Sequence, residues 1–189
     1  MARLKKRKPA RDAKERRARR GEFIESLRDE SDRGLVLISA AYICEKLKEV
    51  LQAKIQQNPE VPEKLIASLF NAHAPLESFA ARIKFAFLLS LVDNYTFHDL
   101  ETVREIRNHF AHDYARAAFG DENVSCLACK LKTANRAFER FGAPPDFDTA
   151  CADDINNQSK KERARFTLAV SEIANQLEER LRGFAASPS

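Results

Sequence analysis

Apolar residues recur at intervals of three and four along most of the chain, which is the spacing of side chains on one face of a helix. The first clear pattern begins after Ser31, a residue suited to cap a helix, and predicts a helix that continues to about Gln56. Its apolar positions are Val36, Ala40, Ile43, Leu47, Val50, Leu51 and Ile55. The Asn58-Pro59 pair ends this helix, and Pro62 starts a short predicted helix from Glu63 to about Asn71.

Four further helices are predicted in the rest of the chain. They run from Ser78 to about Val92, from about His98 to Ala117, from Asn123 to about Phe141, and from about Ser159 to Phe184. Ser78 is again suited to an N-cap. The second half of the Ser78–Val92 helix is apolar nearly all round, so we expect it among the most buried helices. The last helix carries a clean apolar stripe, formed by Phe166, Ala169, Ile173, Leu177, Leu181 and Phe184.

These patterns predict an all-α fold. No stretch of alternating apolar and polar residues is convincing as a strand, and no internal repeat is visible. We therefore expect residues 22–186 to form a single helical bundle of about six or seven helices. The domain organisation that follows is a tail at residues 1–21 and a helical domain at residues 22–189.

The chain is strongly asymmetric in charge. Its first twenty residues hold eleven Lys or Arg against two acids, a formal charge of +9 in a chain whose total is +4, so the remainder is mildly acidic. This basic tail has little that is large and apolar to bury, which predicts a disordered or helical extension. The tail either extends into solvent or contacts the phosphates of DNA or RNA. The candidate nucleic-acid-binding residues are Lys5, Lys6, Arg7, Lys8, Arg11, Lys14, Arg16, Arg17, Arg19 and Arg20.

The cysteine and hydropathy patterns bear on the location of the protein. The four cysteines do not resemble a disulfide framework, and the basic start is not followed by the apolar stretch of a signal peptide. The longest apolar run, Phe85 to Val92, is far too short to span a bilayer. We therefore expect a protein of the reducing cytoplasm that makes no contact with a membrane.

Cys126 and Cys129 have the spacing of half a zinc site. A structural zinc needs four ligands, and the other cysteines, Cys44 and Cys151, are not paired in the same way. Residues three apart on a helix also suit two small thiols buried in the core, which is the interpretation we prefer. No phosphate-binding or dinucleotide-binding glycine motif is present, so we expect neither a metal nor a cofactor.

The segment from Arg107 to His112 resembles the R-x4-H signature of the HEPN ribonucleases, small helical proteins that cut RNA without a metal. That resemblance implies His112 as the general acid or base for attack by the 2′-hydroxyl. Arg107 would stabilise the developing phosphorane charge, and Asn108 would orient the site. Arg107 and His112 lie about 140° apart around a helix, so a second copy across a two-fold axis would have to complete the site. Alternatively, Arg107 pairs with a carboxylate near Glu30 or Asp32 and His112 is simply exposed.

A second resemblance covers the body of the chain. Three blocks carry it, namely Glu30 to Tyr42, Pro75 to Lys84, and Asp99 to His112. Their order and spacing resemble the mannitol operon repressor family from about residue 22 to the last helix, and the Pro75 block is the most specific. The resemblance implies an all-helical regulator that acts through protein partners and has no recognisable DNA-reading motif. In purely structural terms the blocks serve packing, with Arg82 and Lys84 at the rim of the core.

Two functions therefore compete. The one we prefer is a transcriptional regulator of this family, a non-enzymatic protein that binds a protein partner while its basic tail contacts nucleic acid non-specifically. The alternative is a HEPN-type, metal-independent endoribonuclease that serves as a toxin or defence effector. A third interpretation, an accessory protein that binds nucleic acid only through its tail, is compatible with either. A homodimer is compatible with all of them.

Overall fold

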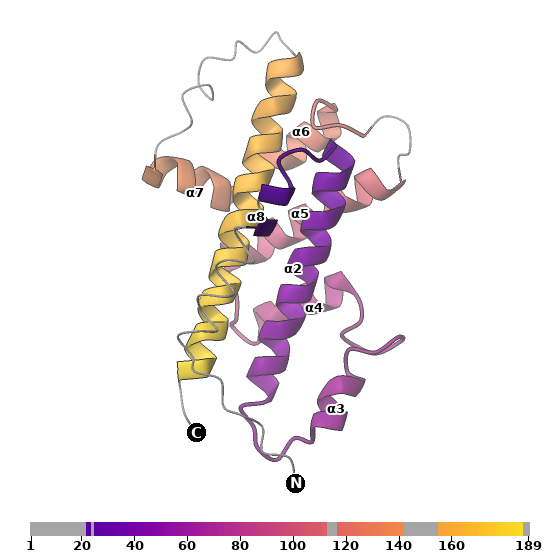
Figure 1. Ribbon diagram of the computed structural model, residues 1–189, viewed down its shortest axis with the longest axis vertical. Helices are drawn as coiled ribbons and strands as arrows, with labels where there is room; N and C mark the ends of the chain where they lie inside the picture. The colour runs from indigo at the N-terminus through magenta and orange to yellow at the C-terminus, as the bar shows by residue number, and fades with distance from the viewer. Residues whose placement is uncertain (1–21, 24, 113–116, 142–154, 187–189) are drawn as a thin grey trace.

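The computed structural model describes residues 22–23, 25–112, 117–141 and 155–186 (Figure 1). Within these ranges it consists of seven helices and contains no strand, so the predicted all-α bundle is confirmed. The helices are α2 (Asp32–Ile55), α3 (Glu63–Ser68), α4 (Phe79–Leu88), α5 (Asn94–His112), α6 (Glu122–Cys129), α7 (Lys132–Phe141) and α8 (Ile155–Ala186). The ten candidate residues of the basic tail lie outside the described ranges. No helix among the described residues is both long enough and apolar enough to cross a membrane.

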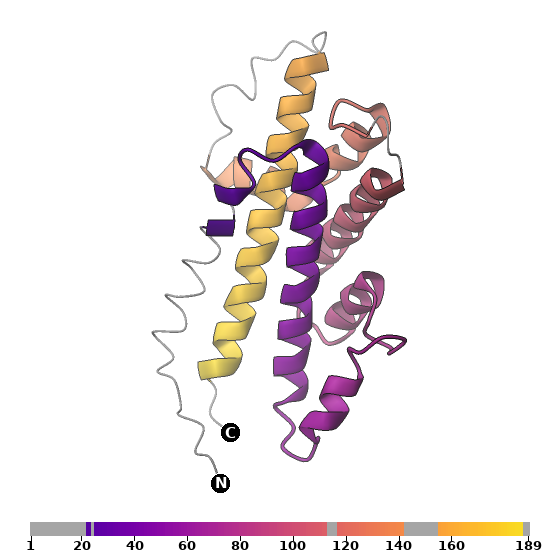
Figure 2. The same cartoon turned by 45° about the vertical axis from the view of Figure 1, so that its right-hand side comes forward.

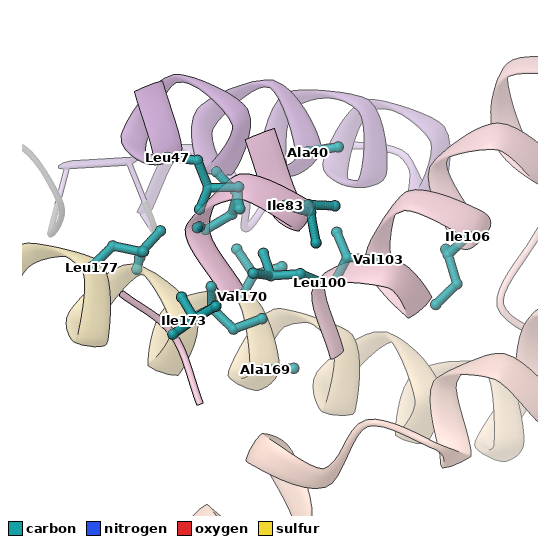
Figure 3. Close-up of a cluster of buried hydrophobic side chains, with 14 of the residues drawn as sticks. Ala40, Leu47, Ile83, Leu100, Val103, Ile106, Ala169, Val170, Ile173 and Leu177 are labelled. Carbon is teal, nitrogen blue, oxygen red and sulfur yellow. The ribbon is translucent and has the colours of Figure 1, made fainter. Parts of the chain in front are cut away.

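The two longest helices, α2 and α8, lie side by side and run in the same direction (Figures 1 and 2). α4 and α5 pack together against α2, while α6 and α7 pack against α5 and α8. The core lies between these helices, and Figure 3 shows side chains of α2, α4, α5 and α8 meeting there. The apolar stripes predicted for the first and last long helices are buried in it, except Ile55 and Phe184, which are half-buried.

Both predicted serine caps are confirmed. The Ser31 hydroxyl accepts a hydrogen bond from the Gly34 N–H at 3.1 Å, and the Ser78 hydroxyl accepts one from the Ala81 N–H at 3.1 Å. Each cap satisfies one of the backbone donors that the first turn of a helix leaves without a partner. The starts of α2 and α4 are therefore set by their own sequences.

The Asp93 side chain caps the start of α5 in the same way. Its carboxylate accepts a hydrogen bond from the Thr96 N–H at 2.7 Å, and the Thr96 hydroxyl in turn donates to Gln176 on α8 at 2.6 Å. Partial burial pushes the pKa of the Asp93 carboxyl up, but the hydrogen bonds from Thr96 and the charge of Arg136 outweigh it. The net effect holds this pKa below its ordinary value.

The segment predicted as one helix from Asn123 to Phe141 is two helices, α6 and α7. The break has a physical cause in Asp99, a fully buried carboxylate on α5. One of its oxygens accepts from the Lys132 N–H at 2.9 Å, and the other accepts from the Thr133 N–H at 2.6 Å and the Thr133 hydroxyl at 2.5 Å. Asp99 thus caps the start of α7 from a different helix.

The prediction that the Ser78–Val92 helix is among the most buried is wrong. α4 ends at Leu88, and Phe85, Leu88 and Leu89 are 42%, 73% and 39% exposed. The cause is the thickness of the bundle, because α4 packs against α2 and α5 and no third layer of described residues covers its outer side (Figure 2). The apolar residues on nearly all sides of this segment therefore did not mean that α4 lies at the centre of the bundle.

α4 ends where it does because the chain turns at a residue in the left-handed conformation. Ser90 has φ 55°, its N–H donates to the Phe87 carbonyl at 2.9 Å, and the Leu91 N–H donates to the Ala86 carbonyl at 2.9 Å. This pair of hydrogen bonds is a Schellman motif, in which glycine usually occupies the left-handed position. The motif stops the helix before the apolar run is finished.

Replacing Ser90 with glycine should stabilise the protein. The left-handed conformation costs a residue with a Cβ roughly 1 kcal/mol, which glycine does not lose. The free energy of unfolding, measured in urea, should therefore rise by up to about 1 kcal/mol. Ser171 in the middle of α8 is the control, since glycine there should lower that free energy by about 0.5 kcal/mol. A Ser90→Gly protein that unfolds at lower urea than the wild type would contradict this account.

Candidate functional site

A cavity of about 590 Å³ opens where α2, the start of α4 and the second half of α5 come together. It is lined by Leu37, Ala40, Ala41 and Cys44 of α2, by residues 77–80 at the start of α4, and by Arg104, Arg107 and Asn108 of α5. All of these except Cys44 fall within the three sequence blocks that carry the family resemblance. Segments far apart in the sequence thus meet around one hollow, which makes it the candidate functional site.

Small side chains create this hollow. Ala40 and Ala41 on α2 and Ala80 on α4 are among its lining residues, and larger side chains at these positions would take up part of the space. The remaining lining combines apolar side chains, such as Leu37 and Phe79, with a few polar groups from α4 and α5. Apolar walls with a small number of polar groups are typical of binding sites in proteins.

The cationic side of the cavity is formed by two arginines of α5. Arg104 donates to one Glu101 oxygen through Nε at 3.0 Å and through Nη2 at 2.7 Å, so its charge is balanced. Arg107 donates through Nη1 to the Asn108 side-chain oxygen at 3.0 Å. Because the Asn108 amide is neutral, it orients the Arg107 guanidinium without cancelling its charge. Arg107 therefore presents a positive charge at the edge of the cavity.

The opposite side of the cavity is the start of α4. Ser78 caps the helix, and Glu77 before it accepts a hydrogen bond from the His73 N–H at 2.6 Å. His73 has φ 62°, so this contact holds a tight turn in the chain leading into the helix. The N–H groups of Phe79 and Ala80 belong to the first turn and have no acceptor within the helix. The rim of the cavity is therefore rich in hydrogen-bond donors.

Arg82 holds this arrangement in place. The sequence interpretation put it at the rim of the core, but its side chain is buried, with 7% exposed. Its Nε donates to the Leu76 carbonyl at 2.8 Å, its Nη1 donates to the Cys44 carbonyl at 3.0 Å, and its guanidinium lies 5.8 Å from the centre of the Phe70 ring. Arg82 thus ties α4 and the segment before it to α2, as a positioning residue beside the cavity.

Cys44 lies between Arg82 and the cavity. Burial raises the pKa of its thiol, and the nearby Arg82 charge opposes this without reversing it. The side chain therefore behaves as a small apolar group of the lining rather than as a reactive thiolate.

The structure brings together only part of the predicted ribonuclease motif. Arg107 and Asn108 line the cavity and contact each other, whereas His112 is exposed at the end of α5 and does not line it. Among the described residues, Arg107 makes no ion pair with Glu30 or Asp32, and the Asp32 carboxylate instead binds Arg163 on α8 at 2.7 Å. The catalytic roles therefore remain a prediction, and Arg107 and His112 do not converge on the cavity within one chain.

The prediction that Cys126 and Cys129 are buried in the core is wrong. Both are exposed on α6, since the buried side of this short helix is formed by Val124 and Ala128 instead. Cys151 lies outside the described residues. In the part of the chain that the structure describes, no group of three or more His, Cys, Asp or Glu is placed to hold a metal ion.

Comparison with known proteins identifies similar chains. The family model for mannitol repressors (MtlR) matches residues 20–178. Among solved structures, a possible transcriptional regulator, YggD, from Shigella flexneri is 13% identical, with a TM-score of 0.67 over 84% of this chain and 98% of that one. The structure of the MtlR–HPr complex from Escherichia coli is 18% identical, with a TM-score of 0.63 over 85% of this chain and 99% of that one. A search of curated proteins found no match.

Proposed function

Because this chain belongs to the mannitol repressor (MtlR) family, we propose that it is a transcriptional regulator that acts by binding a protein partner. The family match carries the proposal, since it spans residues 20–178 and with them every residue that lines the cavity. The convergence of the three family-like blocks on that cavity supports it further. The regulator would work in the cytoplasm, where it meets both its partner and DNA.

The partner we propose is HPr, the protein bound to MtlR in the Escherichia coli complex. The two structures share their fold over 85% of this chain and 99% of that one, which supports the proposal. The residues beyond the tail are mildly acidic in sum, which does not favour the phosphate backbone of DNA as the contact of the body. We therefore propose that the residues beyond the tail contact a protein rather than DNA.

Calorimetric titration tests the proposal directly. The full chain should bind the HPr of its own organism in one saturable step, with a dissociation constant on the order of 1 µM or below. An unrelated acidic protein of similar size is the control, because it separates specific contact from attraction to the basic tail. No detectable binding at about 100 µM would overturn the proposal.

We propose in addition that the basic tail binds DNA or RNA without reading sequence. Its eleven cations are a dense positive charge, and it has no aromatic residue to stack on bases. If about five of these cations engage duplex DNA, the logarithm of the binding constant should fall with the logarithm of salt with a slope near −4 to −5. Fluorescence anisotropy with a labelled duplex at several salt concentrations measures this slope.

Deletion of residues 2–20 is the matched variant for the tail. It should abolish binding to the duplex and leave the melting temperature nearly unchanged, because the tail has no apolar stripe to bury. A duplex of scrambled sequence should bind the full chain equally well. Equal affinity of the full and truncated chains would end the nucleic-acid interpretation of the tail.

A further inference from the structure

Two charges of opposite sign line the cavity between α2, α4 and α5. Arg107 on α5 donates a hydrogen bond to the neutral Asn108 amide, and the Glu77 carboxylate before α4 accepts one from the His73 N–H. Within the part of the chain that the structure describes, neither side chain forms an ion pair, whether with the other or with a third residue. The cavity therefore holds one positive and one negative charge that these residues leave unbalanced.

Two further arginines near the cavity have acidic neighbours. Arg104 belongs to the lining, and its Nη2 lies 2.7 Å from a Glu101 oxygen. Arg82 is not part of the lining, and its Nη1 lies 3.8 Å from a Glu45 oxygen. Both arginines are thus offset by carboxylates, so the two unbalanced charges set the electrostatic character of the cavity.

The Cys44 thiol shows that the Arg107 charge acts inside the cavity. Burial raises the pKa of this thiol, and the charges of Arg82 and, to a smaller degree, Arg107 oppose the rise. Cys44 belongs to the wall that α2 contributes, whereas Arg107 belongs to α5. The Arg107 charge is therefore felt across the cavity, where a bound ligand would meet it.

Apolar side chains make up much of the remaining wall. They come from α2 and from the start of α4, and they are Leu37, Ala40, Ala41, Phe79 and Ala80. The cavity volume of about 590 Å³ lies within the range of roughly 300–1,000 Å³ in which proteins bind small molecules. Because Glu77 and Arg107 line one cavity without pairing, a ligand balances both only if it carries a charge at each end. The apolar wall favours a hydrocarbon chain between those ends.

We propose that the cavity binds a small zwitterionic effector, in which a short hydrocarbon chain joins a carboxylate to an ammonium group. The ligand carboxylate accepts hydrogen bonds from the Arg107 guanidinium and the Asn108 amide. The ammonium group donates to the Glu77 carboxylate, and the hydrocarbon chain covers the alanines of α2 and α4. Binding of the ligand is independent of the proposed function. Its role as an effector rests on that function, because the bound ligand changes the surface that a protein partner meets.

Calorimetric titration of the full chain with matched ligands tests this charge pattern. The two zwitterions are 4-aminobutyrate and 6-aminohexanoate, which carry their charges at opposite ends. Because Glu77 and Arg107 are exposed to solvent, each contact is weak, so the better zwitterion should have a dissociation constant of about 0.1–1 mM. The control is 2-aminohexanoate, an isomer with adjacent charges, which should bind at least about tenfold more weakly. Hexanoate and hexylamine each lack one charge and should be weaker to a similar degree.

Two variants of the cavity test the two charges separately. Glu77→Gln removes the negative charge but keeps an oxygen for the His73 N–H, and Arg107→Gln removes the positive charge. Each should weaken binding of the better zwitterion at least about fivefold. Glu63→Gln and Arg28→Gln remove exposed charges outside the cavity and should leave affinity within about twofold. All four variants should melt close to the wild type, because the altered side chains are exposed.

The outcomes separate this inference from the proposed function. No binding of either zwitterion at about 10 mM, equal binding of 2-aminohexanoate, or unchanged affinity in both cavity variants overturns the ligand site and leaves the proposed function in place. A saturating zwitterion should change the affinity for HPr at least about fivefold, and an unchanged affinity overturns the effector role. If the chain binds the zwitterion but not HPr, the proposed function and the effector role fail, while the ligand site stands.

Discussion

Replacing Asp99 with alanine should lower the free energy of unfolding by about 2–4 kcal/mol. The Asp99 carboxylate is fully buried and accepts three hydrogen bonds, from the two backbone N–H groups that start α7 and from the Thr133 hydroxyl. Alanine leaves these donors buried without an acceptor, and each such donor costs roughly 1–3 kcal/mol in a protein interior. The same change also removes the contact that fixes α7 against α5. Urea denaturation followed by circular dichroism measures the loss.

Two further variants make the Asp99 prediction specific. Asn at this position keeps the shape but offers one oxygen, and its NH₂ group faces a backbone donor, so it should lose about half as much. Asp29→Ala removes an exposed carboxylate and should change stability by less than about 0.5 kcal/mol. An Asp99→Ala protein within about 0.5 kcal/mol of the wild type would show that Asp99 does not hold the start of α7.

Replacing Arg82 with alanine should cost a similar amount, about 2–4 kcal/mol. The Leu76 and Cys44 carbonyls would lose their donor in a buried place, and the contact with the Phe70 ring would be lost as well. Arg82→Lys should recover less than half of the loss, because one ammonium group cannot reproduce the planar fork that reaches both carbonyls. Thermal and urea unfolding of the three proteins provide the comparison.

The matched control for Arg82 is an arginine on the surface. Arg28 pairs with Glu25 at 2.9 Å, but both side chains are well exposed, so Arg28→Ala should change stability by less than about 0.5 kcal/mol. If Arg82→Ala is as mild as Arg28→Ala, Arg82 does not tie α4 to α2. The geometry of the cavity would then need another explanation.

Local patterns in the sequence predicted the parts of the fold that depend on local physics. The stripes of α2 and α8 repeat every three or four residues, and each stripe alone identifies a buried face. The caps at Ser31 and Ser78 act within a single turn, so three residues suffice to predict them. These features needed no knowledge of neighbouring helices.

The features that were missed depend on contacts between distant parts of the chain. Asp99 caps α7 across 33 residues, so no local signal marks the break between α6 and α7. The hydropathy of α4 records how apolar the helix is, whereas its burial depends on how many layers surround it. Arg82 gave one signal that could have been used. A charged side chain that is buried needs hydrogen-bond partners. Arg82 within an apolar helix therefore indicates that its guanidinium donates to acceptors outside that helix, which are the Leu76 and Cys44 carbonyls.

The candidate site was predicted in its parts but not in its geometry. The three family-like blocks were identified in the sequence, and so were Arg107 and Asn108. That the blocks enclose one cavity follows only from the packing of α2, α4 and α5. The separation of His112 from Arg107 was expected, because residues five apart lie about 140° apart around a helix, and His112 indeed does not line the cavity.

Hydrogen exchange with and without HPr is the most direct test of the claim that this regulator binds its protein partner at the cavity between α2, α4 and α5. The amides at the start of α4 and around Arg107 should exchange more slowly in the complex. The amides of α8 on the far side of α2 should exchange at the same rate in both states. Protection confined to α7 or α8, or no protection around the cavity when the protein is saturated with HPr, would contradict the account.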